Sequence, residues 1–494
     1  MNFKSLLLGS VAGLVAAGGA QAADLPVKAK AVEYVRICSL YGAGFYYMPG
    51  TDTCIKLGGY LRADAILGGA GDYSFRQGAN AGLNNRLTNY YFGRARFDFN
   101  VDTRTATEYG VVRTYADVIF SWDTPSVAGV NTAAGVSGSA SLGLYHAFIQ
   151  FAGFTFGRTV SIFDTPWQSY PAGGPDTLPG GSNHVTGVNQ VAYTADFGQG
   201  ITGSLALQDE STSAGGQSNL WNTTFATPAA AGTAFVTGVY GNSDWGGTRS
   251  PEIVGQIRVD QAWGLAQVSA VAHDLHPAYY GATEPSGHPS DKWGWAVQGA
   301  LSIKNIPTGA GDSINLQAVY TDGATRYNFQ SLFPQSFFMF GGSSIAYQST
   351  GFAGLADGVF GVGTGIDTVK TWGFRGGYSH NWNPNWVTGI YGAYAQLKYG
   401  DTGKALICGN FAAIALPGAT CNPDFNFAAV GINTAWTPVK GLTFTADLSY
   451  SHLDQKYSGT ILSPGIAAGA KPIAVYELKD QNSIEMLLRA QRTF

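Results

Sequence analysis

The chain closes on Ser483-Ile-Glu-Met-Leu-Leu-Arg-Ala-Gln-Arg-Thr-Phe494, a stretch with the pattern of a single β-strand. Apolar side chains occupy every second position from Ile484 to Ala490, with Phe494 on the same face, and the positions between them are mostly polar. Arg492 interrupts the apolar face. A soluble domain rarely places a strand flush with its terminus, because free ends fray. A closed β-barrel must pair its last strand with its first, so the stretch predicts the closing strand of a barrel.

The composition favours a barrel wall over a series of soluble domains. Charged residues make up 12% of the 494 residues, well below the roughly 25% of soluble domains. The mean hydropathy is +0.01, as expected when strands turn one face to lipid and the other to water. After residue 22 there is no apolar run of the roughly 18 residues that a spanning helix needs. The net charge of −4 does not indicate a nucleic-acid partner.

The period-two pattern recurs along the chain. Residues 94–102, for example, alternate charged or amide side chains with Ala95, Phe97, Phe99 and one further apolar residue. We count about sixteen such segments, an even number as in single-chain bacterial barrels. The segments are residues 55–66, 90–103, 109–122, 144–151, 154–158, 189–196, 201–208, 252–260, 265–273, 293–304, 313–320, 368–380, 386–398, 426–437, 442–452 and 483–494.

The connections between these segments alternate between short and long, as short periplasmic turns and long outer loops do in transmembrane barrels. The long connections are roughly residues 67–89, 123–143, 159–188, 209–251, 274–292, 321–367, 399–425 and 453–482. The sequence therefore predicts an all-β, antiparallel transmembrane β-barrel. The Gly-rich segment Gly341–Gly365 reads as a flexible part of an outer loop.

Aromatic residues near strand ends suit the two lipid–water boundaries of a barrel, although ordinary β-propensity is the alternative explanation. They include Tyr90, Tyr91, Trp122, Trp293, Trp295, Trp386 and Trp436.

The N-terminus predicts export. An apolar core, Leu6–Ala17, precedes Ala20-Gln21-Ala22, which has the small-x-small form of a signal-peptide cleavage site. We therefore expect a signal peptide (1–22), an N-terminal periplasmic or hairpin segment (23–54) and a barrel (55–494). The four cysteines form two local pairs, Cys38/Cys54 and Cys408/Cys421. In an exported chain these pairs predict two disulfides rather than a metal site, and we expect no cofactor.

The connection Phe154–Gly181 differs from the other long ones, because it is aromatic and rich in Pro and Gly. A loop exposed to water need not be so apolar. If the loop folds back into the barrel, its rings rest on the inner wall and its carboxylates lie in the channel. Proline lowers the entropic cost of fixing such a loop.

At these residues the chain resembles the alphaproteobacterial general porins. The matching features are the Ala22/Ala23-Asp-Leu-Pro start, Lys56-Leu-Gly-Gly-Tyr-Leu-Arg-Ala-Asp64, Phe156-Gly-Arg158, the Gly-Gly-Pro-Asp176 loop and the terminal Phe494. The resemblance covers essentially the whole mature chain. It implies a usually trimeric sixteen-stranded barrel in the outer membrane, in contact with its lipid and lipopolysaccharide. Such a barrel passes small hydrophilic solutes and ions passively, and its third outer loop forms a constriction.

The resemblance also implies roles for particular residues. Acids of the third loop, Asp164 and Asp176, would face a basic ladder across the channel, with Trp167 between them in the loop. The candidate basic residues are Arg62, Arg94, Arg96, Arg113, Arg158 and Arg375. Each of these arginines has an alternative role as a solvated or locally paired charge. Rings of charge would bias ion selectivity.

Other functions compete with a general pore. A substrate-specific channel, for example for sugars, would line the pore with aromatic side chains, and Trp167 and Tyr170 keep that alternative open. A barrel hydrolase would pair a Ser or Asp with a His. His273, His276 and His288 lie near one outer loop, where solvated loop histidines are the simpler interpretation, and no Gly-x-Ser-x-Gly motif is present. We expect no enzymatic activity. The long loops are also compatible with use as an adhesin or phage receptor.

Overall fold

The computed structural model describes residues 36–68, 84–88, 91–124, 139–173, 178–209, 218–225, 227–237, 244–329 and 337–494. The expected signal peptide, the first residues of the N-terminal segment, Tyr90 and Asp176 lie outside these ranges.

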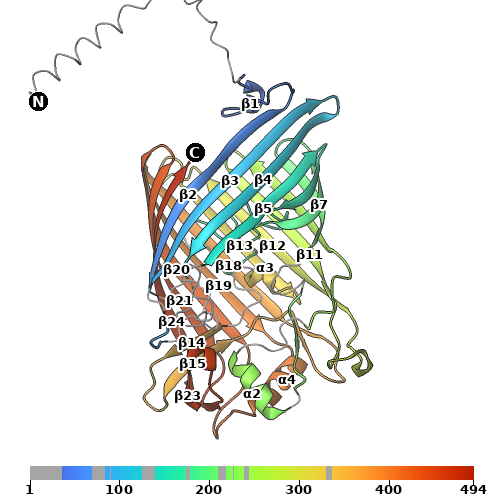
Figure 1. Cartoon of the computed structure of the whole chain (residues 1–494), viewed down its shortest axis with the longest axis vertical. Coiled ribbons are helices and arrows are strands. Elements are labelled where there is room, and N and C mark those ends of the chain that lie inside the picture. Colours follow the sequence, from blue (N-terminus) through green and yellow to red (C-terminus); the bar gives the residue numbers. More distant parts are fainter. Residues whose placement is uncertain are drawn as a thin grey trace, which may run out of the picture.

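Sixteen antiparallel strands close into a barrel, as the alternation pattern predicted (Figure 1). Each sequence segment with that pattern coincides with one wall strand. The wall strands are β2 (Cys54–Gly68), β3 (Tyr91–Thr107), β4 (Gly110–Asp123), β5 (Ser139–Phe151), β6 (Phe154–Thr159), β7 (Val188–Asp196), β8 (Ile201–Asp209), β10 (Glu252–Gln261), β11 (Gly264–Leu275), β12 (Lys292–Lys304), β13 (Ser313–Asp322), β18 (Lys370–Asn383), β19 (Trp386–Lys398), β20 (Phe425–Val439), β21 (Leu442–Gln455) and β24 (Gln481–Thr493).

The C-terminal strand closes the barrel. β24 pairs antiparallel with β2 in a register that runs from Tyr60 opposite Thr493 to Gly68 opposite Glu485. The Phe494 N–H donates to the Gly59 carbonyl at 3.1 Å, so the pairing continues to the last residue. This register leaves no open edge between the first and last wall strands.

The outer surface of the barrel is apolar, with rings near both ends of the strands. Trp386 stacks on Trp436, with 5.7 Å between ring centroids, at the end of the barrel that carries the short turns. Trp295 lies 5.4 Å from Tyr320 near the end that carries the long loops. The described rings that the sequence placed at strand ends are all exposed: Tyr91, Trp122, Trp293, Trp295, Trp386 and Trp436.

The N-terminal segment is tied to the start of the wall. The short strand β1 (Tyr46–Tyr47) pairs with β2, and the expected Cys38–Cys54 disulfide is formed, with its Cα atoms 6.0 Å apart. Figure 1 shows this segment at the end of the barrel where the chain terminates. The helix η1 (Ser39–Tyr41) lies in the same segment.

The long outer loops fold into structure of their own, mostly at the opposite end, whereas α3 lies inside the barrel (Figure 1). Their elements are β9 (Leu220–Asn222), α2 (Pro228–Thr237), η2 (Glu284–Ser286), α3 (Arg326–Phe329), β14 (Phe337–Gly341), β15 (Gln348–Ala353), β16 (Gly358–Phe360), β17 (Asp367–Thr368), α4 (Asp401–Phe411), β22 (Thr460–Ser463), η3 (Ala467–Gly469) and β23 (Ala474–Leu478). The second expected disulfide, Cys408–Cys421, links α4 to the chain that leads into β20.

The expectation that Gly341–Gly365 is a flexible loop is wrong, because this segment contains β15 and β16 and nearly every residue from 349 to 361 is buried. Its glycines permit close packing rather than motion. A Cβ on Gly354, for instance, would lie 2.0 Å from the Trp221 ring. The apolar residues between the glycines, such as Leu355 and Val359, are fully buried in the core of the outer loops.

This outer-loop core extends into the lumen. Along β19 to β21, inward side chains near the outer end are apolar and pack against the loops, including Ala395, Phe425, Phe427 and Leu453. The outer half of the barrel is therefore filled on this side by packed protein.

Candidate functional site

A loop between β6 and β7, residues 160–187, lies inside the barrel, as its aromatic and Pro-rich composition suggested. We call it the inner loop; all of it except residues 174–177 is described. Its Phe163 is fully buried and packs edge-on against Tyr327 of α3, with centroids 4.6 Å apart. The Gly180 N–H donates to the Asn328 carbonyl at 3.0 Å, so α3 contacts the inner loop at two points.

Six glutamines on six neighbouring strands hold the inner loop against the wall, and we call them the glutamine belt. They are Gln190 (β7), Gln208 (β8), Gln256 (β10), Gln267 (β11), Gln298 (β12) and Gln317 (β13). Most of their side-chain amides donate to inner-loop carbonyls, as from Gln190 to Val160 (2.8 Å) and from Gln298 to Phe163 (2.9 Å). Others accept, as Gln317 does from the Trp167 indole at 3.0 Å.

An amide suits this task because it offers both donor and acceptor without a charge to desolvate. The belt is absent from the sequence-based expectations. The sequence feature that could have predicted it is a glutamine at an inward position of each of several consecutive wall strands.

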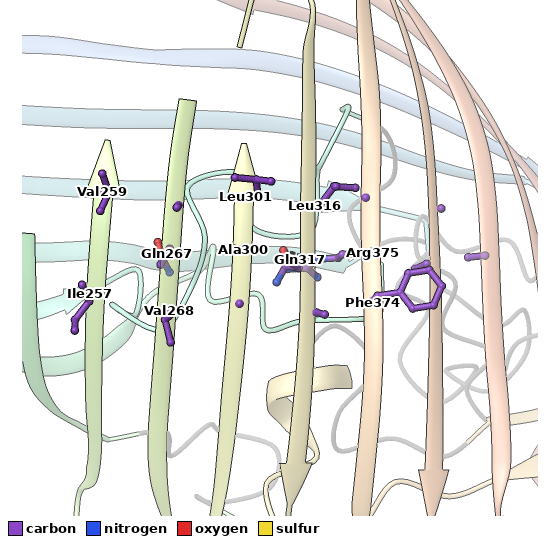
Figure 2. A pocket seen from close by; sticks show the side chains of 17 residues that line it. Ile257, Val259, Gln267, Val268, Ala300, Leu301, Leu316, Gln317, Phe374 and Arg375 are labelled. Carbon is purple, nitrogen blue, oxygen red and sulfur yellow. Dashed lines mark hydrogen bonds between the residues drawn. The ribbon is translucent and has the colours of Figure 1, made fainter. Parts of the chain in front are cut away.

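Arg375 continues the belt on β18. Its guanidinium donates to the carbonyls of Leu178 (2.8 Å), Gly181 (3.2 Å) and Ser182 (2.6 Å) and to Gln317 (2.9 Å). The side chain is 1% exposed, so it lies behind the inner loop. Figure 2 shows Gln267 on β11, then Gln317 and Arg375 on the adjacent strands β13 and β18, with β12 between β11 and β13.

The same strands carry apolar side chains on their outer face, among them Ile257, Val268 and Phe374 (Figure 2). These apolar residues border a cavity of about 920 Å³. Because most of its lining consists of apolar residues that include these outward-facing side chains, it is not part of a water-filled passage.

Asp164 makes its hydrogen bonds within the inner loop. Its carboxylate accepts hydrogen bonds from the Ser182 hydroxyl, from the His184 backbone N–H at 2.5 Å and from His184 Nδ1 at 2.7 Å. The side chain is fully buried. Asp164 therefore ties the two arms of the inner loop together.

A second cavity, of about 730 Å³, lies between the inner loop and the opposite wall. The inner loop contributes neutral residues to it, including Tyr170, Asn183 and Thr186. The wall contributes charged and aromatic residues from β24 and from β2 to β5. These are Tyr60, Arg62, Arg96, Asp98, Asp117, Tyr145, His146 and Arg489, together with the neutral amide of Gln491.

Of the arginines that sequence reasoning singled out, Arg62 and Arg96 line this cavity, directly opposite each other on β2 and β3. Arg489 of β24 was missed, although it shares the polar parity of Glu485 and Gln491. It forms a bidentate pair with Asp64, at 2.7 and 3.0 Å, across the closing seam.

The other candidate arginines have local partners outside this cavity. Arg94 forms a bidentate pair with Asp123, at 2.7 and 2.6 Å. Arg113 binds Asp102 near the short turn of β3 and β4, at 2.9 Å. Arg158, at the root of the inner loop, donates to the Leu144 carbonyl at 3.1 Å.

A β-bulge in β5 brings two neighbouring side chains to this cavity. Asp117 of β4 pairs with His146 and Val118 with Leu144, which leaves Tyr145 as the extra residue. A bulge of this kind re-aims side chains, and both Tyr145 and His146 line the cavity as a result. Simple alternation would place only one of them inside.

The sequence suggested that His273 is a solvated loop residue, and this interpretation is wrong. It lies on β11, fully buried, where its Nδ1 bonds Glu252 and its Nε2 lies 3.8 Å from Asp357. Glu252 also accepts from the Tyr327 hydroxyl at 2.6 Å. Two buried carboxylates require this imidazole between them, and together they fasten α3 and the outer loops to the wall.

Within the described ranges, no helix combines the length and apolar character needed to cross a membrane. The same residues contain no group of three or more His, Cys, Asp or Glu arranged to hold a metal ion.

Comparison with known proteins agrees with this architecture. The family described as Porin subfamily matches residues 24–487. Porin Omp2b of Brucella abortus (strain 2308) is 32% identical over 351 residues, which cover 65% of this chain and 85% of that porin. Porin Omp2b of Brucella melitensis biotype 1 is 32% identical over 353 residues, with the same coverage.

Among solved structures, the outer-membrane channel DcaP of Acinetobacter baumannii shares the fold, with a TM-score of 0.57 and 16% identity over 91% of this chain and 99% of that chain. The family match and the Brucella relatives confirm the resemblance seen in the sequence. The chain belongs to the Porin subfamily and is a bacterial outer-membrane channel for passive diffusion.

Proposed function

We propose that solutes pass between the inner loop and the wall formed by β24 and β2 to β5. The observation that carries this proposal is the 730 Å³ cavity, which combines polar walls with a loop held in place by the glutamine belt. Arg62 and Arg96 would form the basic part of the constriction, joined by Arg489.

The charges of this constriction would lie mostly on one wall. The described inner-loop residues at the cavity are neutral, whereas the family pattern sets loop acids against a basic wall. The Asp98 carboxylate interacts electrostatically with both Arg62 and Arg96. A local field of this kind orders water and polar solutes and disfavours apolar ones.

Assembly and processing remain proposals. We infer a homotrimer embedded among outer-membrane lipid and lipopolysaccharide, with small hydrophilic solutes and ions as its cargo. Residues 1–22 would be removed on export near Ala22, and residues 23–54 would form a periplasmic appendage of the barrel that spans residues 55–494.

A substrate-specific channel, for example for sugars, is the second candidate. The outer-loop core, which fills the outer part of the lumen along β19 to β21, favours it because this core narrows the open path. Tyr60, Tyr145 and Tyr170 line that path and could contact a sugar ring.

Planar-bilayer recording of the mature protein tests the general-pore proposal. We expect ohmic steps that close in groups of three. Arg96→Gln should change the reversal potential in a salt gradient, whereas Arg258→Gln on β10, which does not line the cavity, should leave it unchanged. Equal reversal potentials in the two variants would show that the path lies elsewhere. Saturation of the flux by one sugar would favour the specific channel.

A further inference from the structure

The wall cavity also has the chemistry of a binding site. We propose that it selects small zwitterionic solutes of the amino-acid type, with the ammonium group held by Asp98 and Asp117 and the carboxylate by Arg96. This inference rests on the proposed function in one respect: the cavity must lie on the solute path.

The acidic half of the site has few donors of its own: Asp98 accepts one hydrogen bond, from the Asn100 side-chain amide at 3.2 Å. The carboxyl groups of Asp98 and Asp117 interact electrostatically with each other. Asp117 is 8% exposed, and among the described residues no N–H or hydroxyl group donates to its Oδ1. A buried carboxylate oxygen without a donor is costly. An ammonium group carries three donors and can supply the one that Asp117 Oδ1 lacks.

His146 adds a third acceptor. Its Nε2 lies 3.0 Å from the Val185 carbonyl, which can only accept, so Nε2 carries the proton. In the neutral ring Nδ1 is then an acceptor, and it lies 4.0 Å from Asp117 Oδ2. With the neutral ring, two acceptors face each other across this gap, and a donor or a cation can bridge them.

The basic half of the site is two residues away on the same strand. Arg96 donates to the Ser121 hydroxyl at 3.0 Å, is hydrogen-bonded to the Tyr60 hydroxyl and lies over the Tyr145 ring at 5.9 Å. All three groups are neutral, so none of them offsets the positive charge of the guanidinium, which can pair with the carboxylate of a solute.

The local charges explain why a dipolar solute is favoured over a simple ion. Arg489 is offset by Asp64, and Arg62 and Arg96 are partly offset by the Asp98/Asp117 pair. A wall with a small net charge but separated signs attracts neither anions nor cations strongly. A solute with both charges can satisfy both halves at once.

The test compares two isomers of equal mass, L-alanine and the uncharged lactamide, in swelling assays on liposomes that contain the mature protein. The measured quantity is the ratio of the alanine rate to the lactamide rate. Arg96→Gln and Asp117→Asn each remove one half of the site. Arg258→Gln and Asp260→Asn are matched controls, because these residues pair with each other on β10 at 3.0 Å and do not line the cavity.

We expect the ratio to fall about two- to fivefold in Arg96→Gln and in Asp117→Asn, as expected for a weak ion pair formed in a water-filled cavity, and to stay at the wild-type value in both controls. Heat-modifiable electrophoretic mobility confirms that each variant is folded. If Asp117→Asn does not fold, Asp98→Asn takes its place.

Single-channel conductance of the same variants separates the two possible failures. An altered conductance with an unchanged rate ratio would overturn the zwitterion site and leave the path in place. If neither quantity changes, both the site and the path are overturned.

Discussion

Arg375→Met should release the inner loop from the wall. Methionine preserves most of the side-chain volume but cannot donate to the carbonyls of Leu178, Gly181 and Ser182. The substitution also removes the buried cation that interacts electrostatically with Asp164. The remaining contacts of the glutamine belt lie nearer the other end of the inner loop, so the segment around residues 178–182 should detach first.

The magnitude follows from the contacts that are lost. A hydrogen bond to a charged group contributes about 1.5–3 kcal/mol, and three such bonds reach the inner loop. Water in the lumen can satisfy part of the exposed carbonyls, so we expect a net loss of about 3 kcal/mol for loop attachment. That corresponds to an increase of roughly 100-fold in the population of the detached loop.

Thiol labelling measures that population directly. Leu178 is 1% exposed, and the described residues contain no free cysteine. Leu178→Cys should therefore react slowly with a water-soluble maleimide in the parent protein and much faster when combined with Arg375→Met. Single-channel traces of Arg375→Met should fluctuate between several levels.

Arg258→Met provides the control, because Arg258 pairs with Asp260 away from the inner loop. Labelling rates and traces in Arg375→Met that match those of Arg258→Met would refute the role of Arg375 as the loop anchor.

Three further predictions concern stability. Arg489→Gln should lower the unfolding free energy by about 3 kcal/mol, because it leaves the Asp64 carboxylate buried and unpaired at the seam; urea denaturation followed by tryptophan fluorescence measures this, and a wild-type midpoint would contradict it. Burial raises the pKa of Asp312, in the turn before β13, but hydrogen bonds from one backbone N–H and three side chains hold that pKa well below its ordinary value. Asp312→Asn should therefore destabilise the barrel at pH 7. The difference in stability from the wild type should shrink as the pH falls below about 4, where the carboxyl group of the unfolded chain protonates. Replacing Cys408 and Cys421 by serine should destabilise the outer-loop core by roughly 2–3 kcal/mol and expose it to protease, without changing the reversal potential.

The sequence was sufficient for the wall because the two solvents impose a simple rule on every strand. Lipid on one side and water or packed protein on the other favour a period of two, and this pattern marks a segment of every wall strand from β2 to β24. The disulfides were predictable because each pair is close in sequence. The burial of Asp164 was not predictable, because it depends on contacts with Ser182 and His184. These two residues lie close to Asp164 in space but many residues later in the chain.

The bulge of β5 shows a second limit. Alternation assigns a face to each residue only while the register is unbroken, and one extra residue at Tyr145 reverses the assignment for the rest of the strand. The outer-loop core shows a third. Its short strands and glycines carry no period of their own, so only the buried contacts, such as Gly354 against Trp221, reveal that the segment is packed.

The lumen is thus divided by chemistry. Along β7 to β18 the inward residues that hold the inner loop are the glutamine belt and one buried arginine, Arg375. Along β19 to β21 the inward residues near the outer end are apolar and are used to hold the outer loops. The charged side chains of β24 and of β2 to β5 border the cavity. Substitutions on the first two sectors should therefore act through the shape of the passage and be insensitive to the charge of the solute, whereas substitutions at Arg96 or Asp117 should act through charge and leave the inner loop in place.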